Sequence, residues 1–238
     1  MRGPYGFEIN DSCSTCELKR NGFFCQATSS ELTDLSAVAS PAVYPAGAFL
    51  FLEKQSARGV YILCQGEVKL SISSKEGKRM ILRIAKPGEI LGLSAALSGN
   101  AYESTAETLH PCQATFILRE HFLHYIAQHA EAYQNMVRQL TAEYHSAHEQ
   151  LRTVGLSASA PERLAKLILE WSLDGQQTRT GTKIRMSLTH EEIAECIGVT
   201  RETVTRTLTE FKNRHLLTLN GSSWMIPNRS ALESLVSA

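Results

Sequence analysis

The stretch THEEIAECIGVTRETVTRTLTEFKN, residues 189–213, carries the strongest folding signals in the chain. Thr189 and, three residues later, Glu192 form a capping box of the kind that begins a helix. Gly198 lies between two apolar runs at helical spacing, and glycine accepts the backbone angles of a tight turn that other residues resist. The apolar positions are Ile193, Ile197, Val204, Leu208 and Phe211. The stretch therefore predicts a helix-turn-helix.

The second helix of this stretch carries polar residues suited to reading DNA. Its first two turns place arginine, glutamate and threonine on one face, after a threonine that can cap the helix. In a helix-turn-helix the second helix lies in the major groove, where arginine pairs with guanine and glutamate can accept from cytosine. A solvated helix face is the alternative interpretation. The residues expected to contact DNA are Thr200, Arg201, Glu202, Thr205 and Arg206.

Length and composition limit the number of domains and the class of protein. The chain has 238 residues, of which 43% are hydrophobic, so it can hold two domains with a core in each. Its 24 basic and 24 acidic residues balance, so positive charge for DNA has to be local, as in the segment 200–214. Neither a membrane span nor a signal peptide is evident, so we expect a cytoplasmic protein, in which six cysteines favour metal or redox roles. The sequence has no phosphate loop or nucleophile elbow, and we expect no enzyme activity.

Residues 31–119 read as short alternating runs broken by turns. Two strands with a kink at Gly66 are expected in 60–72, others at 80–84 and 114–118, and turns at 76–77 and 87–89. Short strands at this spacing predict a small antiparallel barrel or roll.

Residues 120–155 predict one long amphipathic helix. Its apolar positions alternate steps of four and three from Ile126 to Val154, the heptad seam of a coiled coil. A helix packed on its own domain is the alternative. A homodimer suits a helix-turn-helix protein, because it presents two reading helices to two half-sites. The residues expected at the dimer interface are Val137, Leu140, Tyr144, Ala147 and Leu151.

The remaining segment, 160–238, completes the DNA-binding domain. Small residues at 155–160 predict a hinge, and Pro161 suits the first turn of the helix that follows. After residue 213, Asn220-Gly221 between two apolar runs predicts a hairpin, the wing of a winged helix. The predicted fold class is thus α+β, with a β-roll, a long helix and a winged helix-turn-helix in that order.

Residues 200–206, TRETVTR, resemble the recognition helix of the CRP/FNR family of transcription regulators, and the resemblance extends over nearly the whole chain. It implies a β-roll sensor domain, a dimerisation helix, double-stranded DNA as ligand and RNA polymerase as partner. It further implies that Arg201 and Arg206 each take a guanine and Glu202 a cytosine. The half-site should then resemble TGTGA rather than the TTGAT type of the family's oxygen sensor.

The N-terminal segment, residues 1–30, holds Cys13, Cys16 and Cys25, and CxxC places two thiols within reach of one metal. The family's oxygen-sensing branch binds a [4Fe-4S] cluster through three N-terminal cysteines and one in the β-roll. The resemblance implies Cys112 as that fourth ligand. A zinc site, a thiol switch, haem, another ligand or none remain alternatives. A cyclic nucleotide is disfavoured, because no arginine occurs between Arg83 and Arg119 to hold its phosphate.

Overall fold

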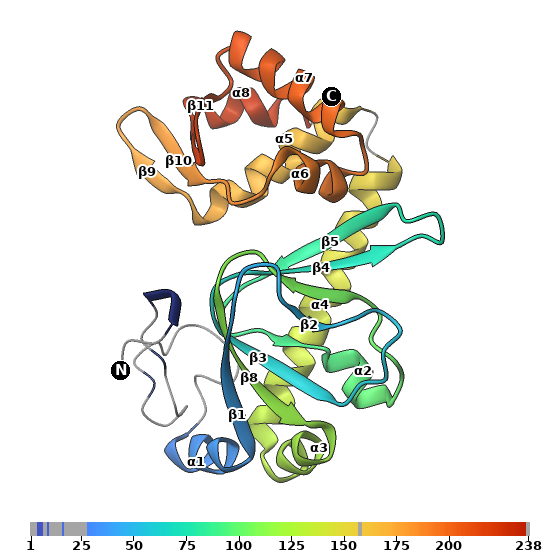
Figure 1. The fold of residues 1–238 in the computed structure, drawn as a ribbon. Coiled ribbons are helices and arrows are strands. Elements are labelled where there is room, and N and C mark those ends of the chain that lie inside the picture. Colours follow the sequence, from blue (N-terminus) through green and yellow to red (C-terminus); the bar gives the residue numbers. More distant parts are fainter. Residues whose placement is uncertain (1–3, 7–8, 10–15, 17–27, 157–158, 237–238) are drawn as a thin grey trace. The chain divides into compact units, whose positions relative to one another are not determined.

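The computed structural model describes residues 4–6, 9, 16, 28–156 and 159–236. The chain divides into two compact units, Met1–Ser146 and Ala147–Ala238, and the division falls within the helix α4, Ala130–Leu156. The first unit combines two sheets with several helices, and helices dominate the second (Figure 1). In the ranges described, no helix is both long enough and apolar enough to cross a membrane.

The strands of the first unit pair into two four-stranded antiparallel sheets, in the orders β1-β8-β3-β6 and β2-β7-β4-β5. The kink predicted at Gly66 and the turn at Gly77 separate three of these strands, and both glycines have positive φ. A side chain at Gly66 would also place its Cβ 2.4 Å from the Cys112 sulfur. The predicted roll is therefore confirmed. The strands are β1 Ala39–Tyr44, β2 Phe49–Phe51, β3 Gly59–Gln65, β4 Val68–Ser73, β5 Arg79–Ala85, β6 Ile90–Leu91, β7 Thr105–Thr108 and β8 Cys112–Leu118.

Alternation along β3 divides the core of this unit into two layers. Val60 and Ile62 pack against helices, whereas Leu63 belongs to the cluster enclosed by the sheets. Because successive side chains of a strand point to opposite faces, one strand serves both layers. The helices are α1 Ser29–Val38, α2 Leu93–Ser98, α3 Arg119–Gln128 and α4, besides the short 3-10 turn η1 Pro4–Gly6.

The prediction of one continuous helix over 120–155 is wrong at a single residue. His129 leaves helical geometry (φ −118°, ψ 99°) and separates α3 from α4. Its ring packs on Tyr125, with centroids 4.5 Å apart, and lies 3.6 Å from Glu31 and 3.4 Å from Asp34 of α1. The apolar residues keep the same spacing in the sequence before and after His129, so the periodicity did not predict the break.

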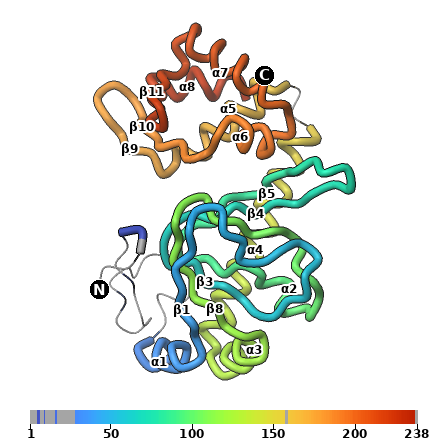
Figure 2. Tube along the Cα trace, in the orientation of Figure 1, coloured from blue at the N-terminus to red at the C-terminus, as the bar shows by residue number. Residues whose placement is uncertain are grey.

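The described residues of the second unit form the end of α4, four further helices and a small antiparallel sheet. Figure 2 traces the chain from α5 through the β9–β10 hairpin into α6 and α7. The wing predicted around Asn220-Gly221 is confirmed as the β11–β12 hairpin, and the sheet runs β11-β12-β10-β9. The elements are α5 Ala160–Trp171, η3 Ser172–Asp174, β9 Gln176–Thr178, β10 Gly181–Arg185, α6 His190–Ile197, α7 Arg201–Asn213, β11 Thr218–Asn220, β12 Ser223–Ile226 and α8 Arg229–Glu233.

Gln139 fixes α4 to the roll through the backbone of β6. Its side chain accepts from the Ile90 N–H at 3.0 Å and donates to the Ile90 carbonyl at 2.7 Å, and it is buried. Because β6 is the edge strand of its sheet in the described part of the chain, the glutamine pairs backbone groups that have no neighbouring strand on that side.

We predict that Gln139→Leu lowers the free energy of unfolding by about 2 kcal/mol, because it leaves two buried backbone groups without partners. Denaturant unfolding of the variant measures the loss. Gln134→Leu is the matched control, because Gln134 is exposed on the same helix. Equal stability of the two variants would contradict the role given to Gln139.

Candidate nucleic-acid interface

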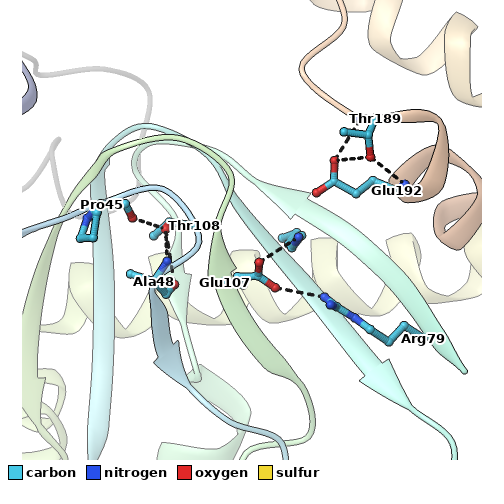
Figure 3. A network of polar contacts seen from close by, with 8 residues as sticks. Pro45, Ala48, Arg79, Glu107, Thr108, Thr189 and Glu192 are labelled. Atoms are coloured by element: carbon cyan, nitrogen blue, oxygen red, sulfur yellow. Dashed lines mark hydrogen bonds and ion pairs between the residues drawn. The ribbon is translucent and has the colours of Figure 1, made fainter. Parts of the chain in front are cut away.

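The first helix of the candidate interface, α6, begins at the predicted capping box. The Thr189 N–H donates to the Glu192 carboxylate at 2.9 Å, and the Glu192 N–H donates to the Thr189 hydroxyl at 3.2 Å (Figure 3). Two N–H groups that a helix start leaves unpaired are thereby satisfied. The cap fixes where α6 starts and so which residue, His190, occupies its first position.

The turn between α6 and α7 depends on Gly198. Its backbone is left-handed (φ 67°, ψ 37°) and its N–H closes α6 on the Ala194 carbonyl. Thr200 then caps α7, because its hydroxyl accepts from the Thr203 N–H at 3.3 Å. The helix-turn-helix predicted from the sequence is confirmed at each of these positions.

The predicted apolar positions form the inner face of this motif. All five are at most 2% exposed, and they are Ile193, Ile197, Val204, Leu208 and Phe211. Burying one face of α7 leaves the opposite face to solvent, and the exposed residues of its first two turns include Arg201, Glu202, Thr205 and Arg206. The structure thus brings the predicted DNA-contacting side chains together on one surface, with Thr200 exposed at its edge.

Two side chains from other helices hold the last turn of α6. Gln150 of α4 donates to the Cys196 carbonyl at 2.7 Å, and Arg163 of α5 donates to the Ile197 carbonyl at 3.3 Å. The last carbonyls of a helix have no partner within it, so these contacts satisfy groups that the turn leaves open. Neither contact could be predicted from sequence patterns, because each joins residues more than thirty positions apart.

The electrostatics of α7 suit a helix that reads base edges. Hydrogen bonds from its own backbone N–H and from the Thr200 side chain hold the pKa of Glu202 below its usual range. The carboxylate is therefore ionised at neutral pH and can only accept, which matches the amino group of cytosine. Arg201 and Arg206 supply donors on either side of it.

His190 is a residue of this surface that sequence reasoning missed. Its Nδ1 lies 3.0 Å from the Thr205 hydroxyl, so a side chain of α6 reaches the exposed face of α7. The two residues are fifteen positions apart, and only the angle at the Gly198 turn brings them together.

The polar centre of the first unit surrounds Arg83. Its guanidinium pairs with Glu89, directly after Gly88, and with Glu143 of α4 at 2.7 Å. Burial raises the pKa of Glu143, and the charge of Arg83 opposes that shift. Nearby, Ser94 donates to the Glu103 carboxylate at 2.7 Å. This centre therefore holds the carboxylates of Glu89, Glu103 and Glu143, and Arg83 is paired with the first and the last of them.

The predicted cysteine ligands fall in different parts of the chain. Cys13 and Cys25 lie outside the described residues, and Cys16 is half-buried. Cys112 is fully buried at the start of β8, and its thiol donates to the carbonyls of His110 at 3.0 Å and Glu67 at 3.3 Å. Burial raises the pKa of the Cys112 thiol to about 11. Within the ranges that the structure describes, no three His, Cys, Asp or Glu side chains are placed to share a metal ion.

The predicted dimer residues lie mostly at the surface of α4. Val137, Tyr144 and Leu151 are 43%, 63% and 69% exposed, Ala147 is exposed, and Leu140 is half-buried against the roll. The apolar seam is therefore a surface feature rather than part of the core of this chain.

A β-roll followed by a long helix and a winged helix-turn-helix defines a DNA-binding regulator that carries a sensor domain. Two family models match the chain, the cyclic nucleotide-binding domain over residues 41–129 and the Crp-like helix-turn-helix domain over residues 162–235. The chain belongs to the CRP/FNR family of transcription regulators and is not an enzyme.

Relatives and solved structures agree with this assignment. A CRP-like cAMP-activated global transcriptional regulator of Mycobacterium tuberculosis is 27% identical over 216 residues, which cover 90% of this chain and 96% of the relative. The nitrogen fixation regulation protein FixK of Azorhizobium caulinodans is 27% identical over 204 residues, or 84% of this chain and 81% of FixK. Among structures, FixK2 from Bradyrhizobium japonicum has a TM-score of 0.75 at 22% identity, covering 84% of this chain and 98% of FixK2.

We predict that Arg206→Ala weakens binding to the cognate duplex by about 1–3 kcal/mol and relaxes the choice of one base pair, because a bidentate contact is lost. Fluorescence anisotropy on duplexes that vary each base pair in turn measures both effects. Arg214→Ala is the matched control, because Arg214 follows α7 and pairs with Glu210. A uniform loss across all duplexes would assign Arg206 to the phosphate backbone instead.

Proposed function

We propose that the chain acts as a homodimeric transcription regulator that inserts one α7 into each half of a palindromic DNA site. The observation that carries this proposal is the exposed apolar seam of α4, which continues to within a few residues of the DNA-binding domain. Two copies joined along this seam would present two reading helices related by two-fold symmetry, and the target would share that symmetry.

The chemistry of the seam favours a second copy of this chain as its occupant. Tyr133, Val137, Tyr144 and Leu151 are large apolar residues left in water, at positions that keep the spacing of a coiled coil. Burying one such side chain contributes about 1.5–3 kcal/mol, so several buried symmetrically suffice for a stable pair. The opposite face of α4 is occupied, because Ala132, Met136 and Gln139 pack against the roll.

The half-site proposed for each α7 resembles TGTGA. Support comes from the side chains exposed on α7, two arginines that suit guanine and an ionised glutamate that suits cytosine. An unbiased selection from random duplexes tests it, and recovery of sites without guanine or without two-fold symmetry would reject it. RNA polymerase as a partner stays a prediction.

We predict that Tyr144→Lys shifts the protein from dimer to monomer, because it places a charge in the seam. Sedimentation velocity measures the change, and affinity for a palindromic duplex should fall with it. His145→Lys is the matched control, because His145 is exposed on the same helix but outside the heptad seam. Dissociation of both variants alike would point to a general effect on α4 rather than to the seam.

For the sensory input, we propose that the cysteines carry an oxygen, nitric oxide or redox signal through a [4Fe-4S] cluster. The support is the spacing of Cys13, Cys16 and Cys25 together with the resemblance that marks Cys112. A cyclic nucleotide is less well supported, because Arg83 is already paired with Glu89 and Glu143. A cofactor-free regulator, a zinc site or a thiol switch is the alternative.

Cys112 does not fit the role of cluster ligand in the conformation described. A ligand must be a thiolate directed at iron, whereas this thiol is buried, donates to two carbonyls and has its pKa raised to about 11. The N-terminal cysteines are therefore the better supported part of the proposed set.

We predict that protein purified without air contains iron and acid-labile sulfide, and that Cys16→Ser abolishes both. Cys112→Ser tests the fourth position separately, because retention of iron in that variant would remove Cys112 from the ligand set. Cys64→Ser is the matched control, since Cys64 lies in β3 and its thiol contacts the Thr115 hydroxyl. Iron-free anaerobic protein would reject the cluster and leave the DNA-binding function unaffected.

A further inference from the structure

His190 occupies a position at the edge of the DNA-reading surface that the proposed base contacts do not use. It is the first residue of α6, directly after the Thr189 cap, and its ring reaches Thr205 on the exposed face of α7. The ring is partly exposed, and in the part of the chain that the structure describes only Nδ1 is hydrogen-bonded.

The neighbouring hydrogen bond of Thr205 fixes the proton on the ring. A threonine hydroxyl has one proton, and that of Thr205 is donated to the Arg201 carbonyl at 3.0 Å. With that proton so placed, the Thr205 oxygen accepts from His190, and we assign the hydrogen to Nδ1 on this basis. When Nδ1 carries the hydrogen and donates to Thr205, Nε2 of the neutral ring can only accept. Nε2 becomes a donor when the ring is protonated.

The position of His190 in the helix-turn-helix indicates which group of the DNA its Nε2 would contact. In a helix-turn-helix on DNA the first helix crosses the phosphate backbone while the second enters the groove. Phosphate oxygens only accept hydrogen bonds, so the neutral ring offers a phosphate nothing and the protonated ring offers it a charge-assisted hydrogen bond. We propose that His190 is a phosphate-contacting residue that binds DNA in its protonated form, held in place by Thr205.

The charged neighbours along α6 and α7 do not remove this dependence on protonation. On α6 they are Glu191, Glu192 and Glu195, of which Glu192 is engaged by the Thr189 cap. On α7 they are Arg201, Glu202, Arg206, Glu210 and Lys212. Arginines keep their charge across the range in which imidazole titrates, and the lowered pKa of Glu202 keeps its carboxylate ionised there. Among the described residues of α6 and α7, His190 carries the one imidazole, the type of side chain that serves proteins as a switch of charge near neutral pH.

Linkage gives the sign of the effect. Because the protonated ring binds the phosphate and the neutral ring does not, complex formation takes up a proton and affinity rises as pH falls. The added contact also releases one more counterion in each protomer. The slope of log affinity against log salt should therefore steepen by about 0.9 per protomer, or about 1.8 for a dimer.

The inference rests on the proposed reading of DNA by α7, and the experiment separates the two. Fluorescence anisotropy of the full chain on its selected duplex, over a salt series at about pH 6 and about pH 8, yields the two slopes. We expect the steeper slope at the lower pH for the unmodified protein and equal slopes for His190→Gln. Thr205→Ser should keep the difference, because serine retains the hydroxyl, whereas Thr205→Val should reduce it.

His215→Gln is the matched control, because His215 lies beyond the end of α7, and it should leave both slopes unchanged. Equal slopes in the unmodified protein would overturn the inference, as would a difference that persists in His190→Gln. Absence of binding to any duplex at either pH would overturn the proposed DNA reading itself. Binding that depends on Arg206 but not on pH would retain the reading and reject only the role of His190.

Discussion

The DNA-reading surface depends on how the last turn of α6 is held. Gly198 ends that helix in a left-handed conformation, and the carbonyls just before it point out of the helix without internal partners. Gln150 from α4 takes one of them and Arg163 from α5 takes the next. Helices distant in sequence thus meet at the turn that sets the angle between α6 and α7, so a change at the end of α4 has a direct path to the reading helix.

Different faces of the helix α4 make different contacts. Gln139 and Glu143 on one face bind the backbone of β6 and the guanidinium of Arg83. Tyr144 and Leu151 on another are exposed and available to a second copy. The face toward the roll combines the apolar packing of Ala132 and Met136 with polar groups that are paired within the chain.

Local chemistry made the helix-turn-helix predictable, whereas contacts over long sequence separation were not. The capping box at Thr189 and the glycine turn are set by neighbours in sequence, and both were found at the predicted residues. The break at His129 was missed, because one residue out of helical geometry leaves the apolar period intact. The pairing of His190 with Thr205 was missed for another reason: it exists only once the turn angle is fixed. Likewise, spacing alone gave no information on the burial of the Cys112 thiol.

The balanced charge of the chain limits how tightly one protomer can hold DNA. In the proposed reading of DNA, Glu202 would improve the choice of base but repel phosphate, and so reduce the nonspecific attraction supplied by Arg201 and Arg206. With equal numbers of basic and acidic residues, no broad positive surface compensates. In the proposed dimer, joining two such readers would raise affinity, because the second half-site would be met at a high effective concentration. The α4 seam would therefore affect DNA affinity more strongly than any single base contact. The affinity lost through Glu202 would be offset by the affinity gained through dimerisation.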